Sequence, residues 1–206
     1  MEKLSGSIGT QLLKAAQMIR EGGTVAYPTE TVYGIGADAT SDAAVRCVFA
    51  CKKREDAKAV SILVPGVSDL IDYAILPYGF NPGVFLPGPV TLLLKIKAGN
   101  HHRISSLCVS DMGIVGFRVS SNPFACELAR LCGRPITATS ANHAGDASPS
   151  SHDEVSEDLE VDALICAGPS VFGKPSTVFD VSGMRVVREG ALDAESIRSR
   201  LGKSHK

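Results

Sequence analysis

The chain has 206 residues and a formal net charge of −1, from 21 Lys and Arg against 22 Asp and Glu. One domain can hold this length, and a hydrophobic fraction of 44% excludes a disordered chain. The balanced charge excludes a polycation, so contact with nucleic acid would need a local cationic patch. The absence of Trp and an aromatic fraction of 5% also argue against a base-stacking platform.

The sequence holds no apolar run close to the roughly 20 residues that span a membrane. Residues 1–7 are mostly polar and lack the layout of a signal peptide. The six cysteines form no C-x-x-C pair and no compact Cys/His cluster, so we expect reduced thiols and no metal held by the protein. These features predict a cytoplasmic protein without membrane contact.

Apolar periodicity, capping residues and β-branched runs predict alternating helices and strands. In chain order the predicted elements are helix 10–21, strand 24–27, helix 41–52, strand 59–64, helix 67–74, strands 90–95, 104–109 and 114–119, helix 122–133, strand 136–138, helix 151–159, strands 162–166, 176–181 and 185–188, and helix 193–201. Residues 76–89 hold four prolines and three glycines and should form a loop inside the domain. The pattern indicates one α/β domain, residues 1–206 with a core at about 8–202, built on a mixed sheet.

Two segments come close to nucleotide-binding motifs and fail on mechanism. Residues 34–39 spell G-x-G-x-x-A, but the first glycine does not directly follow the predicted strand, and the next helix starts only near Ser41. Residues 168–175 nearly spell a Walker A loop, but Pro175 replaces the hydroxyl residue that would bind magnesium, and a strand follows instead of a helix. A nucleotide, if bound, must therefore use another cradle.

Polar segments of small residues lie at the ends of several predicted strands, where α/β proteins commonly bind ligands. They are residues 27–34, 85–91, 116–119, 137–148, 175–177 and 187–190, together with the cationic run at 52–54 and Lys58. Each also has a purely structural interpretation. Arg118 could form a structural ion pair, the cationic run could be a solvated helix end, and residues 139–142 could be a simple hydroxyl-capped turn.

Taken together and in this order, the segments resemble the YrdC/TsaC family, the L-threonylcarbamoyladenylate synthases. The resemblance rests on PTETVYGIGADA, FLPGPVTLLLK, GFRV, PITATSAN, PSTVFD and VVREG. It implies a twisted open α/β sheet with a concave cationic surface. It also implies a nucleotidyltransferase that joins L-threonine, bicarbonate or CO2, and ATP into threonylcarbamoyl-AMP and pyrophosphate. A downstream transferase would then modify tRNA, and the resemblance also allows weak direct contact with tRNA or other RNA.

The resemblance also implies a role for individual residues. The L-threonine site would use Thr31, Arg118, Ala138 and Ser176. The ATP site would use Arg54, Lys58, Ser140, Asn142, Ser148 and Arg188. Arg118 suits a carboxylate because a guanidinium binds two oxygens at once. Mg²⁺ would arrive with ATP and not in a cage of protein ligands.

The sequence departs from the family pattern at two points. Glu55 and Ala59 stand where prolines usually follow Arg54 and Lys58, which should loosen that loop. We also expect no appended C-terminal domain of the kind that some relatives carry. Two other functions remain open: a non-catalytic module that binds double-stranded RNA or tRNA, and carbamoyl transfer of the kind found in hydrogenase-maturation proteins.

Overall fold

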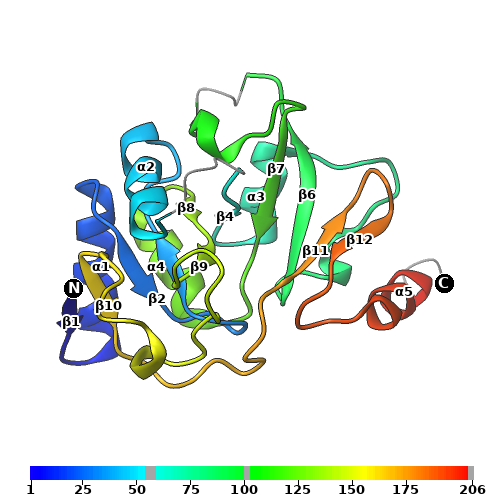
Figure 1. Cartoon of the computed structure of the whole chain (residues 1–206). Coiled ribbons are helices and arrows are strands. Elements are labelled where there is room, and N and C mark those ends of the chain that lie inside the picture. Colours follow the sequence, from blue (N-terminus) through cyan, green and yellow to red (C-terminus); the bar gives the residue numbers. More distant parts are fainter. Residues whose placement is uncertain (54–58, 100–102, 204–206) are drawn as a thin grey trace.

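The computed structural model describes residues 1–53, 59–99 and 103–203 of the chain (Figure 1). The helices in this part are α1 (Ile8–Arg20), α2 (Asp42–Cys51), α3 (Val67–Tyr73), α4 (Pro123–Cys132) and α5 (Ala194–Lys203). The strands are β1 (Glu2–Leu4), β2 (Val25–Tyr27), β3 (Gly34–Gly36), β4 (Ile62–Leu63), β5 (Ala74–Ile75), β6 (Val90–Ile96), β7 (Ile114–Arg118), β8 (Ile136–Thr137), β9 (Thr139–Ser140), β10 (Ala163–Ile165), β11 (Thr177–Asp180) and β12 (Arg185–Arg188).

The strands form two mixed sheets that stand side by side in Figure 1. Sheet A has the order β1-β10-β2-β3-β9, and its first three strands are parallel. Sheet B has the order β12-β11-β6-β7-β4-β8, with β5 paired beside β6. The predicted α/β class with a mixed sheet is confirmed, but the strands divide between two sheets instead of forming one.

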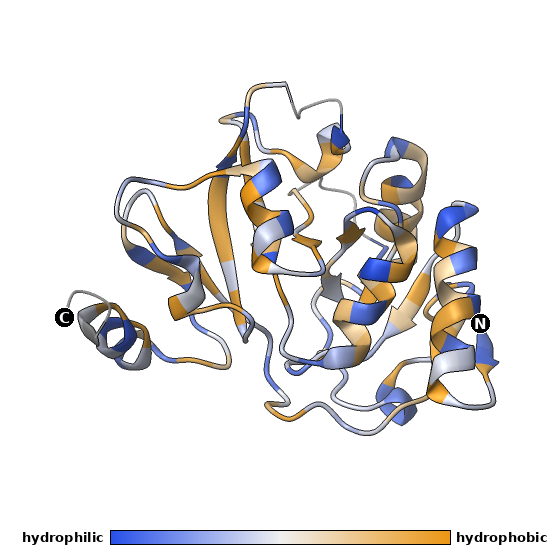
Figure 2. Ribbon diagram, turned by 180° about the vertical axis from the view of Figure 1, so that it is seen from behind, coloured by the Kyte–Doolittle hydropathy of each residue, from blue (hydrophilic) through white to orange (hydrophobic). Residues whose placement is uncertain are grey.

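The inner strands of sheet A, β10, β2 and β3, are buried throughout, which explains why they hold no charged residue. Val25 and Tyr27 pack with α1 and α4 on one face, whereas Ala26 packs with α2 on the other. Sheet B packs around Phe117 and Phe179, with helix α3 and the 76–89 loop against it. Figure 2 shows the hydrophobic residues on the strands and on the helix sides that face them. Within the described residues, no helix is both long and apolar enough to cross a membrane.

The helix ends follow the local chemistry that the sequence predicts. Ser41 caps α2, because its hydroxyl accepts a hydrogen bond from the backbone N–H of Ala44. Asn122 caps α4 directly before Pro123, and Gly133 ends that helix in the left-handed conformation. Asp193 accepts from the N–H of Ser196 at 2.7 Å, at the start of α5.

Two predicted elements are wrong, and polar side chains are the reason in both. Residues 104–109 are not a strand, because Ser105 and Ser106 turn toward the carboxylate of Asp42 and support one 3-10 turn at Ser106–Cys108. Residues 151–159 hold only the 3-10 turn His152–Glu154. The Glu154 carboxylate binds back to the N–H of Ser150, and this local bond competes with helix formation.

Four strands were not predicted: β1, β3, β5 and β9. Strand β3 is hard to recognise because two of its three residues are glycines, which are depleted in strands. The glycines are required by packing, since a Cβ on Gly36 would lie 3.1 Å from the Tyr27 ring. Strand β9 is only two residues long, and a single residue separates it from β8 in the other sheet.

Gly133→Ala tests the left-handed end of α4. At φ 68° an added Cβ meets no neighbour but strains the backbone, so the substitution should cost about 1 kcal/mol and lower Tm by about 2–4 °C. Gly202→Ala is the control, because that glycine lies within α5 and also has open space around it. It should leave Tm unchanged or raise it. A Gly133→Ala protein as stable as the wild type in thermal unfolding would contradict the argument.

Candidate functional site

A cavity of about 340 Å³ opens between the two sheets. Its walls come from the 27–34 turn, strands β6, β7 and β9, the 59–61 segment, and both ends of the β11–β12 hairpin. Its lining residues are Tyr27, Thr29, Val32, Gly34, Ala59, Val60, Ser61, Thr91, Leu93, Arg118, Ala138, Thr139, Ser140, Ser148, Pro175, Ser176, Val178 and Arg188. Segments that lie up to 161 positions apart in the chain, from Tyr27 to Arg188, therefore meet at one hollow.

Most of the residues proposed from the sequence meet in this cavity. Its lining includes Arg118, Ala138, Ser140, Ser148, Ser176 and Arg188. Thr31 is fully buried and does not line the cavity, but its hydroxyl contacts Arg118. Asn142 also lies outside the lining, two residues after Ser140. Arg54 and Lys58 fall outside the described residues.

Arg118 is the last residue of β7 and lines the cavity, and two residues of the 27–34 turn hold its guanidinium in place. Its Nη2 donates to Glu30 Oε1 at 2.7 Å, and its Nη1 donates to Thr31 Oγ1 at 3.1 Å. Both side chains of the Arg118–Glu30 ion pair are nearly inaccessible to solvent, at 6% and 4% exposure. Arg118 Nε is buried and has no hydrogen-bond partner. The arginine is thus both a structural ion pair and a cavity residue with an unused donor.

Arg188 enters the same cavity from the end of β12. Its Nη2 donates to the backbone carbonyl of Ser176 at 3.0 Å, which fixes the guanidinium beside the start of β11. Burial lowers the pKa of Arg188, and the nearby charge of Arg118 lowers it further. Two guanidinium groups that line one partly buried cavity favour an anion over a cation as its occupant.

Hydroxyl groups line the cavity together with the two arginines. Ser176 Oγ lies 2.7 Å from Thr91 Oγ1, so each hydroxyl orients the other. The backbone of Ser176 is held by a close approach, because a Cβ on Gly190 would lie 2.2 Å from the carbonyl oxygen of Pro175. Only glycine fits there, and it brings the 175–177 segment against the end of β12.

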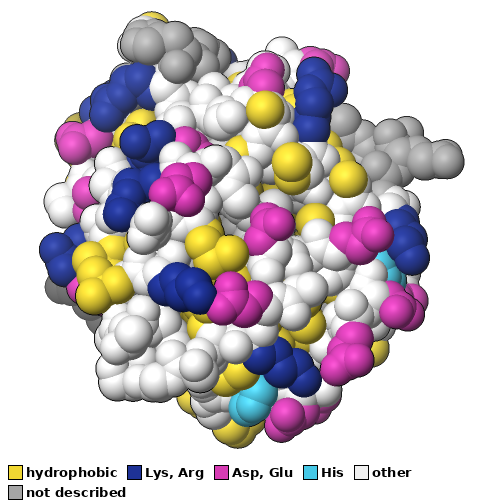
Figure 3. All heavy atoms as spheres, turned by 90° about the vertical axis from the view of Figure 1, so that its left-hand side faces the viewer, with side chains coloured by type: hydrophobic (Ala, Val, Ile, Leu, Met, Phe, Trp, Pro, Cys, Tyr) yellow, Lys and Arg dark blue, Asp and Glu magenta, His cyan; other side chains and the backbone are white. Residues whose placement is uncertain are grey.

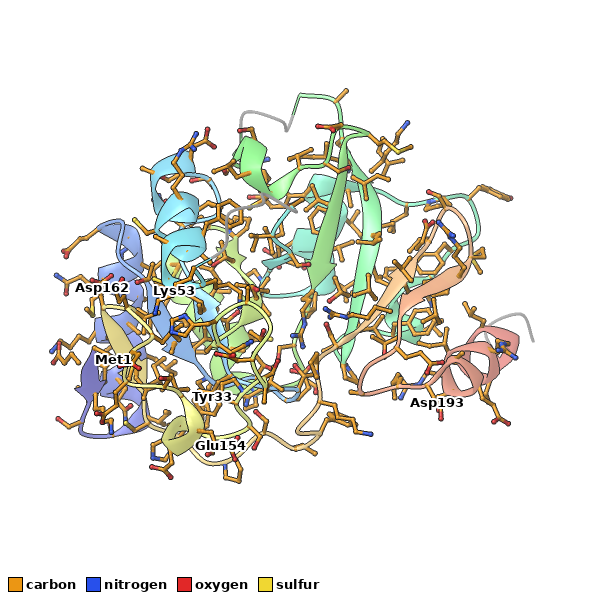
Figure 4. All side chains as sticks on the ribbon, in the orientation of Figure 1. Met1, Tyr33, Lys53, Glu154, Asp162 and Asp193 are labelled. Carbon is orange, nitrogen blue, oxygen red and sulfur yellow. The ribbon has the colours of Figure 1, made fainter. Side chains whose placement is uncertain are left out.

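Lys52 supports the cavity wall, a role that the sequence analysis did not assign to it within the cationic run 52–54. Its Nζ donates to the backbone carbonyls of Ser140 at 2.6 Å and Asn142 at 2.7 Å, and the side chain is buried. The backbone carbonyl of Lys52 also accepts from the N–H of Ala144. A solvated helix end is therefore the wrong interpretation for Lys52. Lys53, labelled in Figure 4 at the end of α2, is exposed.

The loop after β9 is held to the rest of the cavity wall by Tyr33. Its N–H donates to the carbonyl of Pro149, and its hydroxyl donates to the carbonyls of Ala167 and Gly168. Burial raises the pKa of Tyr33 to about 12, so the phenol keeps its proton and remains a donor. Tyr33 lies near the 3-10 turn that carries Glu154 (Figure 4). This support fixes the segment that carries Ser148.

Two cavity residues, Ser61 and Thr91, were also missed by sequence reasoning, and so was Glu30, which contacts Arg118 from behind the cavity wall. Glu30 and Thr91 lie inside motifs that the analysis singled out, so their neighbours could have drawn attention to them. Ser61 belongs to a predicted strand with no polar pattern, and nothing in the sequence distinguishes it. Its carbonyl accepts from the N–H of Ala138 at 2.7 Å and so helps to place that residue at the cavity wall.

The donor set of the cavity favours anions over metal ions. Within the described residues no group of three His, Cys, Asp or Glu side chains is placed to hold a metal. The buried carboxylate nearest to Arg118 is Glu30, and its two oxygens are already bound to Arg118 and Ser120. The hydroxyls and guanidinium groups suit carboxylate or phosphate oxygens.

The face seen in Figure 3 differs in character from the cavity. Lys and Arg side chains alternate there with Asp and Glu, and no broad region of one sign is visible. Surface ion pairs of this part include Lys14–Glu2 at 2.5 Å and Lys3–Glu157 at 3.5 Å. Such a mixed face gives little attraction for a polyanion.

Comparisons with known proteins agree with one another. The Sua5/YciO/YrdC family model, described as "Telomere recombination", matches residues 17–190. The threonylcarbamoyl-AMP synthase of Bacillus subtilis is 32% identical over 95% of this chain and 58% of the relative. A Methanocaldococcus jannaschii protein, provisionally named threonylcarbamoyl-AMP synthase, is 34% identical over 87% of this chain and 85% of the relative.

A solved structure gives the same result for the fold. The crystal structure of Pyrococcus abyssi Sua5 complexed with L-threonine superposes with a TM-score of 0.85 at 32% identity. The match covers 98% of this chain and 60% of that one. The chain thus spans about three fifths of the length of the Bacillus subtilis and Pyrococcus abyssi proteins.

Lys52→Met tests the anchoring of the 140–144 segment. Two hydrogen bonds from a buried ammonium are lost, so the free energy of unfolding should fall by at least about 2 kcal/mol. Lys53→Met is the matched control: the same substitution one residue later, at an exposed side chain, should change it by less than about 0.5 kcal/mol. Urea unfolding measures both. Equal stability of the two variants would show that Lys52 holds nothing in place.

Proposed function

The chain belongs to the Sua5/YciO/YrdC family, and on this basis we propose that it is an L-threonylcarbamoyladenylate synthase. The proposed reaction converts L-threonine, bicarbonate or CO2, and ATP into threonylcarbamoyl-AMP and pyrophosphate. The observation that carries the proposal is the convergence of Arg118, Arg188 and Ser176 in one cavity. Two cations beside hydroxyl groups match a reaction in which a carboxylate meets a triphosphate.

The L-threonine side of the proposal uses Arg118, Ser176, Ala138 and Thr31. The Arg118 guanidinium would bind the carboxylate of the amino acid, and Ser176 together with the backbone of Ala138 would bind its polar groups. Since Thr31 touches Arg118 and does not line the cavity, its contribution would pass through that guanidinium. The Pyrococcus abyssi Sua5 structure described above contains L-threonine, which supports this assignment.

The ATP side of the proposal uses Arg188, Ser140 and Ser148, which line the same cavity. Arg188 would neutralise phosphate charge. Asn142 would act on the shape of the loop, because its side-chain amide donates to the carbonyls of His143 and Asp146. Arg54 and Lys58 stay assigned to the phosphates from the family resemblance alone.

The proposed reaction requires the protein to position the substrates and to neutralise their charge, but it requires no nucleophile from the protein. With CO2, the threonine nitrogen forms a bond to its carbon and loses a proton. With bicarbonate, the nitrogen forms a bond to the bicarbonate carbon and one molecule of water is released. The resulting carbamate oxygen then forms a bond to the α-phosphorus, and the bond to the β-phosphate breaks. Arg118 and Arg188 would hold the two negatively charged reactants close together while pyrophosphate departs.

Mg²⁺ is the cofactor we propose, and it would be held by the phosphates of ATP. It would neutralise phosphate charge when bound. The residues fit this arrangement, since the cavity offers hydroxyl groups while the buried carboxylate of Glu30 is already used. A downstream tRNA threonylcarbamoyl transferase and a cytoplasmic location belong to the same proposal.

A direct assay decides between synthesis and the alternative of a non-catalytic RNA-binding module. The full chain is incubated with L-threonine, bicarbonate, ATP and Mg²⁺, and pyrophosphate is measured. We expect release that requires both L-threonine and bicarbonate, with threonylcarbamoyl-AMP as the second product by mass spectrometry. ATP binding in calorimetry without threonine-dependent pyrophosphate release would favour the module instead.

The two arginines should separate the two substrates. Arg118→Lys keeps the charge beside Glu30 but loses the two-pronged donor, so the KM for L-threonine should rise at least about tenfold. The Kd for ATP should change by less than about threefold. Arg188→Lys should show the reverse pattern. If both variants weaken the two substrates equally, the assignment of one arginine to each substrate is wrong.

A further inference from the structure

Glu30 has both carboxylate oxygens engaged behind the cavity wall. Oε1 accepts from Arg118 Nη2 at 2.7 Å, and Oε2 accepts from the hydroxyl of Ser120. The residue is 3% exposed and does not line the cavity. Its place is therefore behind Arg118, out of reach of a substrate. A buried charge of this kind acts through the group that it touches.

Two neighbouring residues fix the guanidinium of Arg118 at separate nitrogens. Glu30 binds Nη2, and Thr31 binds Nη1 at 3.1 Å. These contacts prevent rotation of the planar group and leave Nε as a buried donor with no partner. We propose that Glu30 is a positioning residue for L-threonine: it holds Arg118 in the orientation that receives the amino-acid carboxylate. The inference rests on the proposed function.

The turn that carries Glu30 is itself rigid. Thr29 Oγ1 accepts from the N–H groups of Thr31 and Val32 and donates to the carbonyl of Val32. The backbone carbonyl of Glu30 accepts from the N–H of Phe172 at 2.9 Å. Glu30 is therefore held in place through both its backbone and its side chain. A residue that orients a neighbouring side chain must itself be fixed in this way.

Charge gives a second reason for a carboxylate at this position. Arg118 and Arg188 carry two positive charges and Glu30 carries one negative charge, so these three side chains leave a net charge of +1. Without Glu30, the repulsion between Arg118 and Arg188 would lose the negative charge that is bound to Arg118. Burial lowers the pKa of Arg188, and the charge of Arg118 lowers it further. Glu30 therefore holds Arg118 in place while the pair of arginines still attracts an anion.

Glu30→Gln tests the inference in the full chain. Glutamine keeps the volume but loses the charge that holds Arg118, so the KM for L-threonine should rise at least about tenfold, which corresponds to about 1.4 kcal/mol. The kcat at saturating L-threonine should stay within about threefold, and the Kd for ATP should not weaken. Loss of the buried ion pair lowers Tm in either case, so Tm does not discriminate. A purely structural role would instead affect both substrates and kcat together, and that result would overturn the proposal.

Two further variants keep the test decisive. Ser120→Ala removes the hydrogen bond to Oε2 and the one that Ser120 Oγ accepts from the N–H of Asn122, but it leaves the Glu30 charge in place. It should raise the KM for L-threonine by about threefold, and it decides the question if Glu30→Gln fails to fold. Glu127→Gln makes the same chemical change in the exposed Glu127–Arg130 pair and should change nothing. An unchanged KM for L-threonine in a folded Glu30→Gln protein overturns the inference alone. A wild-type protein that neither binds L-threonine in calorimetry nor releases pyrophosphate overturns the proposed function as well.

Discussion

A charge buried between two sheets needs a fixed partner, and this requirement organises the centre of the molecule. Arg118 stands at the end of β7 in sheet B, whereas Glu30 and Thr31 belong to the turn that leaves β2 in sheet A. An unpaired guanidinium there would carry a large desolvation penalty. The ion pair therefore ties the two sheets together at the point where the cavity opens, so the same contact serves the fold and the site.

Close backbone approaches complete the junction between the sheets. The chain passes from β8 in sheet B to β9 in sheet A across Ala138, whose N–H is bound by the carbonyl of Ser61. At the opposite wall, Gly190 lets the end of β12 contact the backbone at Pro175. Main-chain contacts therefore hold these two wall segments in place.

The sequence predicted those parts of the structure that depend on local chemistry. The ends of α2 and α4 follow from Ser41, Asn122 and Gly133, whose side-chain or backbone preferences act within one turn. Strand β3 could not be predicted, because its glycines are required by close contact with the ring of Tyr27 and do not follow a strand pattern. Likewise the family motifs pointed to Arg118, but its partner Glu30 becomes recognisable only when the turn is seen against β7.

Lys52 and Arg118 show why the type of cation matters in this protein. Both are buried, but the compact ammonium of Lys52 binds two carbonyls of the 140–142 segment and so supports the wall. The planar guanidinium of Arg118 binds Glu30 and Thr31 and still has a donor with no partner. A flexible point charge is suited to gathering backbone oxygens, whereas a rigid fork can be held on one side and present donors on the other. The wall therefore uses lysine, and the proposed anion site uses arginine.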